Sequence, residues 1–126
     1  MNRALWILQI VFGLYFIAIG VVHFVLPSDL PDQMAWMYEL SDSMHIIAGT
    51  LEILGGFGLI LPSVTRIRPV LTPSAAGGLA LLMIAAAIWH AQQGHGSNIP
   101  MNMVFAGLMA AVAYGRFRVS PIFSGQ

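Results

Sequence analysis

An almost wholly apolar segment with one carboxylate near its middle constrains this chain more than any other feature. It runs from Ser43 to Pro62, reads SMHIIAGTLEILGGFGLILP, and has Glu52 as its one Asp, Glu, Lys or Arg. About 20 residues at ~1.5 Å rise per residue cross the hydrocarbon core of a bilayer as a helix. A charge near the bilayer centre costs at least about 2.5 kcal/mol, so Glu52 must face protein or a wet cavity, find a partner, or hold its proton.

Composition places the whole chain in the membrane class. Of its 126 residues, 58% are hydrophobic and 8% are charged, whereas about a quarter are charged in soluble domains. We therefore expect one transmembrane domain over residues 1–126. The sequence has no cysteine, which excludes disulfides, iron–sulfur clusters, thiolate zinc sites and dithiol redox chemistry. The absence of a basic cluster argues against a nucleic-acid partner.

Four apolar runs predict an all-α fold, a bundle of four transmembrane helices. The first run could be mistaken for a signal peptide, but its apolar core is too long and no small-residue cleavage site follows, so we interpret it as a retained helix. Pro27 and Pro62 are expected to end the first and second helices. The four helices are predicted at about residues 4–26, 43–61, 73–91 and 99–115.

A short amphipathic segment, PSDLPDQMAWMYELSD at residues 27–42, separates the first two predicted helices. It carries four of the five acidic residues, Asp29, Asp32, Glu39 and Asp42. We expect a short interfacial helix here. Trp36 and Tyr38 are of the aromatic types that settle at headgroup level, and packing against the mouth of the bundle is the alternative for both.

The charges are distributed unevenly between the two ends of the predicted bundle. Every arginine falls on one side: Arg3, Arg66, Arg68, Arg116 and Arg118. Every acid except Glu52 falls on the other. By the positive-inside rule, both termini are expected to be cytoplasmic in an inner (plasma) membrane, with the acidic segment and the turn around His95 facing outward.

Histidines gather near the expected outer level. His45 and Glu52 are seven residues apart, which places them on one helix face about 10 Å apart along the axis. His23 and His90 lie near the outer ends of the first and third helices. This pattern predicts a funnel-shaped polar site with histidines at its mouth and Glu52 below them.

Three chemistries could use such a site. A divalent metal needs ligands within about 2–2.2 Å, and Glu52 lies about two turns too deep, so no metal ligand is assigned. Haem would need paired histidines that span both leaflets, and the chain offers no such set. A buried carboxyl with histidines that titrate near neutrality could relay protons or hydrogen-bond a quinone headgroup.

Structural roles compete with these functional ones. Histidines are common at membrane interfaces, and a protonated Glu52 could simply link two helices. Interhelical hydrogen bonds average only about 0.6 kcal/mol in membranes, so stability alone is a weak reason for a buried acid. The eight methionines fit core packing better than soft-metal binding.

Several segments together resemble the DoxX-like family of small four-helix membrane proteins. They are HFVLP at residues 23–27, AGTLEILGGFGLILP at 48–62, AAAIWHA at 85–91 and AYGRF at 113–117. The most specific part, E-x-x-G-G-x-G-L-x-L-P, is matched by Glu52, Gly55, Gly56, Gly58, Leu59, Leu61 and Pro62. The resemblance covers nearly the whole chain and implies a four-span bundle. Founding members of the family are linked to a thiosulfate:quinone oxidoreductase, and other relatives to oxidative-stress or chaperone-like membrane complexes. Thiol chemistry cannot be carried over to a chain without cysteine.

Two functional hypotheses follow. The first is an accessory or structural subunit of a larger redox or respiratory-type membrane complex, which is not catalytic on its own and which contacts the bilayer, other membrane subunits or a second copy. One reason for it is that the sequence shows no convincing set of catalytic residues. Another is the rows of small residues that suit close contacts between helices, formed by Ala106 with Ala110 and by Gly107 with Ala111 and Gly115. The alternative is a site for a quinone or a lipid headgroup at Glu52, His45, His23 and His90.

Overall fold

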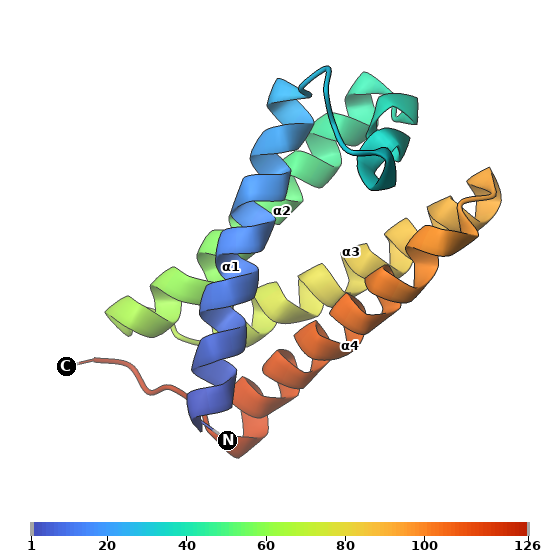
Figure 1. The fold of residues 1–126 in the computed structure, drawn as a ribbon. Helices are drawn as coiled ribbons and strands as arrows, with labels where there is room; N and C mark the ends of the chain where they lie inside the picture. The colour runs from blue at the N-terminus through green and yellow to red at the C-terminus, as the bar shows by residue number, and fades with distance from the viewer. Residues whose placement is uncertain (1, 126) are drawn as a thin grey trace.

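The structure, a computed structural model, describes residues 2–125 and consists of four long helices joined up and down (Figure 1). They are α1 (Asn2–Val25), α2 (Asp42–Thr65), α3 (Leu71–Gln93) and α4 (Ile99–Tyr114). Shorter turns complete the chain: η1 (Asp32–Glu39), η2 (Gly96–Asn98) and η3 (Gly115–Val119). The predicted all-α fold with four long helices is confirmed. The amphipathic segment contains the 3₁₀ helix η1.

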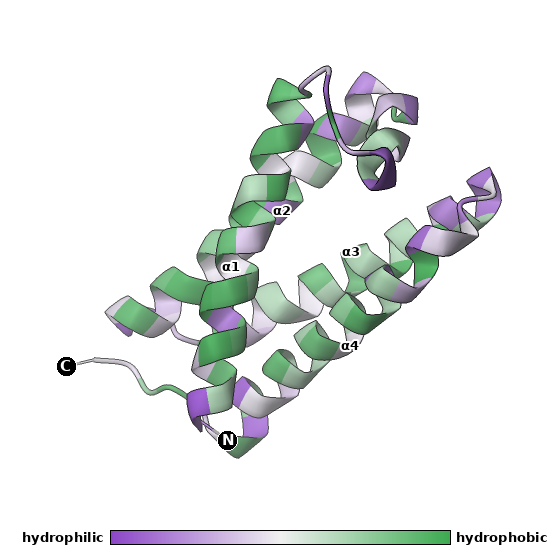
Figure 2. Ribbon diagram, in the orientation of Figure 1, coloured by the Kyte–Doolittle hydropathy of each residue, from purple (hydrophilic) through white to green (hydrophobic). Residues whose placement is uncertain are grey.

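The outside of the bundle is suited to lipid. Each of α1, α2 and α3 is long and apolar enough to cross a membrane, as is the stretch Gly96–Val119 that contains α4. Figure 2 shows apolar residues along all four helices and hydrophilic residues mainly toward their ends. Large apolar side chains such as Ile7, Leu54 and Leu81 are exposed, which is unfavourable in water. The chain is therefore a multi-pass membrane protein.

The helices pair into two hairpins, α1/α2 and α3/α4. Figure 1 shows the hairpins diverging toward the end that carries η1. We call this the acidic end, and the opposite end, where Arg3 and Arg66 lie, the arginine end. Within the first hairpin the backbones touch, since a Cβ on Gly20 would lie 2.8 Å from the Gly49 carbonyl oxygen and one on Gly56 would lie 2.6 Å from that of Gly13. Only glycine permits this approach.

The predicted end of the second helix at Pro62 is wrong, because α2 continues to Thr65. A proline inside a helix leaves the carbonyl four residues earlier without its usual partner, and here that carbonyl belongs to Gly58. The hydroxyl of Thr72, on α3, donates to the Gly58 carbonyl at 3.0 Å. A neighbouring side chain thus replaces the missing backbone bond, as membrane helices require. Arg66 then ends the helix in a left-handed conformation with φ 58°.

A buried polar network joins the helices at the arginine end. The Gln9 amide donates to the Leu59 carbonyl at 2.8 Å and to Ser63 at 3.0 Å. Arg116 is buried, and its guanidinium donates to Gln9 Oε1 and to Asn2 Oδ1. Arg116, one of the five arginines at this end, thus ties α1 to η3.

Candidate functional site

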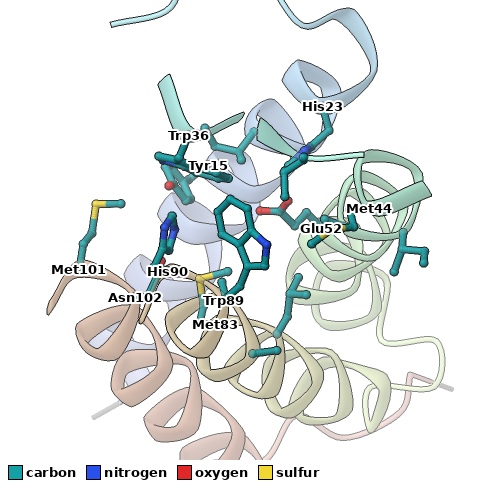
Figure 3. A pocket seen from close by; sticks show the side chains of 17 residues that line it. Tyr15, His23, Trp36, Met44, Glu52, Met83, Trp89, His90, Met101 and Asn102 are labelled. Carbon is teal, nitrogen blue, oxygen red and sulfur yellow. The ribbon is translucent and has the colours of Figure 1, made fainter. Parts of the chain in front are cut away.

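A cavity of about 220 Å³ lies between the two hairpins near the acidic end. Residues from all four long helices and η1 line it, and we call it the hairpin pocket. Its walls combine aromatic and polar side chains, which Figure 3 shows converging. The aromatic ones are Tyr15, Trp36 and Trp89, and the polar ones His23, Glu52, His90 and Asn102.

Glu52 pairs with His23 on the wall of this pocket. His23 Nε2 lies 2.9 Å from Glu52 Oε1, and both side chains are buried. The glycine contacts explain this pairing, since Gly20 and Gly49 each precede one of the two residues by three positions and lie on the same helix face. The close approach of α1 and α2 at these glycines brings the two side chains within reach of each other.

His45 extends this pair into a chain. Its Nδ1 lies 2.9 Å from Nδ1 of His23, so His23 is bonded at both ring nitrogens. When Nε2–H of His23 donates to Glu52, Nδ1 of His23 accepts from His45. Nε2 of His45 is buried without a hydrogen-bond partner. His45 lies behind His23 and does not line the hairpin pocket.

The sequence predicts that Glu52 lies deeper in the bundle than His23, yet the two side chains are in contact. Side chains on an α-helix point toward its N-terminus, which for α2 is the acidic end. The carboxylate of Glu52 therefore reaches back to the level of His23, which a count of residues along α2 overlooks. His90, by contrast, lies on α3 across the pocket. The structure thus brings His23, His45 and Glu52 together and leaves His90 in a second group.

This arrangement is linear and differs from a chelate. The two nitrogens of His23 point in opposite directions, one to Glu52 and one to His45, so the three groups do not converge on a common point. Within residues 2–125, no cluster of three or more His, Asp or Glu side chains is suited to hold a metal ion.

His90 begins a second chain of the same composition. Its Nδ1 lies 3.1 Å from Nδ1 of His95, and Nε2 of His95 lies 3.0 Å from a carboxylate oxygen of Glu39. His90 is buried, whereas the Glu39 side chain is 49% exposed, so the chain runs from the pocket wall to the surface. It also joins η1 to the α3–α4 turn. Sequence reasoning missed this group, because no regular spacing relates Glu39 to His95.

The two predicted interfacial aromatics take different positions. The centroid of the Trp36 ring lies 4.9 Å from that of the His90 ring and 6.2 Å from that of the Trp89 ring. Trp36 therefore covers the pocket from η1. This is packing against the bundle mouth, the alternative that the sequence left open. Tyr38 is exposed, and its hydroxyl donates to the Pro27 carbonyl and accepts from the Leu30 amide.

Asn102 is a pocket residue that sequence reasoning also missed. It is 6% exposed, it lines the cavity, and its amide nitrogen has no hydrogen-bond partner. A buried amide N–H without a partner costs about 1–3 kcal/mol. An asparagine three residues into an apolar helix was the available signal.

Comparison with known proteins agrees with this architecture. The model of the DoxX-like family matches residues 7–112. No curated protein and no solved structure matches the chain. The matched range covers most of α1, all of η1, α2 and α3, and α4 as far as Val112, and so contains both histidine–carboxylate chains. The chain therefore belongs to the DoxX-like family.

Proposed function

We propose that this protein binds the planar polar head of a lipid-soluble molecule of the quinone class in the hairpin pocket. The observation that carries the proposal is the amide of Asn102, a buried donor without a partner at a cavity walled by aromatic rings. A carbonyl oxygen of a bound ring would satisfy that donor. The cavity, at about 220 Å³, is smaller than the roughly 300–1,000 Å³ of sites for drug-sized ligands, which favours a single ring.

Charge favours a quinone over a phospholipid headgroup. Glu52 is the one Asp, Glu, Lys or Arg among the lining residues, so an anionic phosphate would meet a carboxylate and no arginine or lysine. A neutral ring can instead stack edge-on or offset against Trp36, Trp89 and Tyr15.

The second histidine chain could exchange a proton with such a head. With Nε2–H of His95 bonded to Glu39, Nδ1 of His95 accepts from His90, which leaves Nε2 of His90 as an acceptor. A hydroxyl of the reduced, hydroquinone form of the head could give its proton to this nitrogen. His90 would pass its Nδ1 proton to His95, and His95 its Nε2 proton to Glu39, leaving an anionic head in the pocket. The half-exposed Glu39 would release the proton to water.

The binding experiment uses a tailless benzoquinone and the tryptophan fluorescence of the detergent-solubilised protein. Trp36 and Trp89 line the pocket, and Trp6→Phe removes the tryptophan that does not. We expect saturable quenching. Asn102→Leu should lower the affinity obtained from it about tenfold, because one hydrogen bond to the ring is lost. Equal affinity in the Asn102→Leu and unsubstituted proteins would refute the proposal.

A role as an accessory subunit is the second candidate, and the outer face of α4 favours it. A Cβ on Gly107 would meet no atom within 4 Å, and Ala111, one turn further, is also exposed. Small exposed residues at this spacing permit close contact with another membrane helix. Of the other members of the predicted rows, Ala110 is exposed, whereas Ala106 and Gly115 pack inside the bundle. Purification of a native complex that Gly107→Leu disrupts would support this role, and a monomer in native membranes would exclude it.

A further inference from the structure

A second cavity, of about 400 Å³, lies between α2 and α3. Leucines form much of its walls, and glycines widen it. We call it the α2/α3 groove, defined by Leu51, Leu54, Gly58, Gly78, Leu79 and Leu82.

Gly78 keeps the groove open. A Cβ built on Gly78 would meet no atom within 4 Å, whereas one on Gly58 would lie 2.7 Å from the Cβ of Ala75. Gly58 therefore allows the two helices to approach each other, and Gly78 borders empty space.

The walls of the groove offer no free polar side chain to an occupant. Ser74 lies on its wall, but the Ser74 hydroxyl donates to the Val70 carbonyl at 2.9 Å. The remaining lining side chains are apolar.

The groove adjoins the hairpin pocket. Leu82 lines both cavities, and Leu51 of the groove directly precedes Glu52 of the pocket. Where the pocket borders α2 and α3 its walls include Ile47, Ala48 and Ala85, which present no polar barrier. From there the groove extends toward Pro62 and Leu71 at the arginine end.

We propose that the α2/α3 groove holds the hydrocarbon tail, a single linear isoprenoid chain, of the molecule whose head occupies the hairpin pocket. This inference rests on the proposed function and names the ligand class more closely. The levels of Leu51 and Pro62 are about 16 Å apart along α2, so a volume of about 400 Å³ corresponds to a cross-section of about 25 Å². One hydrocarbon chain fits this cross-section. An α-helix with its side chains, about 10–12 Å in diameter, is too wide for it.

Two neighbouring glycines on α3 provide a matched experiment. Gly78→Leu places a side chain in the groove. Gly77→Leu is the control, because Gly77 lines neither cavity and a Cβ on it also meets no atom within 4 Å. The probes are two quinones with the same ring, one tailless and one with a three-isoprene tail. We expect Gly78→Leu to reduce the affinity for the tailed quinone at least about tenfold, since several buried methylenes are displaced, and to leave the tailless one unchanged. We expect Gly77→Leu to change neither.

The alternatives give different results. Equal loss of the tailed quinone in both variants, or no loss in Gly78→Leu, overturns the inference. A change of oligomeric state in Gly78→Leu with unaltered quinone affinities shows that the groove receives a helix, and also overturns it.

A linear isoprenoid alcohol tests the groove without the ring. Native mass spectrometry of the protein with farnesol should show a bound molecule that Gly78→Leu abolishes and Gly77→Leu retains. That result supports the groove even if the tailless quinone does not bind, in which case only the proposed function fails. Binding that is equal in all three proteins, or absent from all of them, overturns the inference.

Discussion

The imidazole of His23 and the carboxylate of Glu52 lie 2.9 Å apart on the antiparallel helices α1 and α2, and both are buried. The pair satisfies an acid that would otherwise be costly inside a membrane. His23 can do this because its second nitrogen is held by His45, which fixes the orientation of the ring.

Removing both members of this pair should destabilise the protein by less than the two single changes added together. His23→Leu leaves Glu52 without its partner and should cost about 1–3 kcal/mol of unfolding free energy, whereas His23→Leu with Glu52→Leu should cost less than the sum of the single changes. Reversible unfolding in mixed micelles measures this double-mutant cycle. Additive costs would show that the pair is energetically unimportant.

Asn102→Leu should leave the stability of the unliganded protein unchanged or raise it. The substitution removes a buried donor that has no partner, and leucine suits the surrounding apolar side chains. Thermal unfolding in detergent, without ligand, provides the measurement. A clear decrease in the unfolding temperature would mean that Asn102 has a structural role, and the loss of quinone affinity in this variant could then not be assigned to a direct contact.

Thr72→Val should destabilise α2 by about 1–2 kcal/mol, because the Gly58 carbonyl loses its hydroxyl donor. The cost should be smaller in a Pro62→Ala background, where the backbone N–H at position 62 can bond to Gly58 directly. Unfolding measurements on the four proteins of this cycle test the explanation. An equal cost in both backgrounds would contradict it.

Glu39→Gln should loosen η1 from the α3–α4 turn, because it weakens the contact with His95. Trp36, which lies on η1 over the pocket, and Trp89 in the pocket wall should then become more accessible to acrylamide in a Trp6→Phe background. Asp32→Asn removes an equal charge from the same short helix and serves as the control. Equal acrylamide quenching in the two variants would show that the Glu39–His95 contact does not hold η1 in place.

The orientation in the membrane can be tested directly because the chain has no native cysteine. Ser97→Cys at the acidic end should react with a membrane-impermeant maleimide applied to intact spheroplasts. Ser124→Cys, near the C-terminus, should react only after the membrane is permeabilised. Both serines are exposed. The reverse pattern would invert the proposed topology, in which both termini are cytoplasmic in the plasma membrane.

The sequence predicts the framework of this protein well, since runs of about 20 apolar residues have few alternatives to membrane helices. It fails at Pro62, because the donor that replaces the missing backbone bond is Thr72 on another helix. It identifies Glu52 as the residue in need of a partner but cannot choose among the histidines, since the choice depends on how α1 and α2 align at Gly20 and Gly49.

The second histidine chain illustrates a different limit. Glu39 and His95 lie in connecting segments, where no helical periodicity relates one residue to another. Asn102 is hidden for another reason, because the neutral amide carries no charge to mark it in an apolar run. These contacts depend on how the hairpins pack, which the one-dimensional pattern does not encode.

The diverging hairpins have a consequence for the surrounding lipids. Arg116 and Gln9 tie the narrow end together through buried bonds, whereas the broad end is held across its gap by a contact that includes the half-exposed Glu39. Sideways pressure from a crowded or thickened membrane would therefore act mainly on the broad end. If the proposed ligand enters the hairpin pocket between the diverging hairpins, bilayer tension would set how readily it does so.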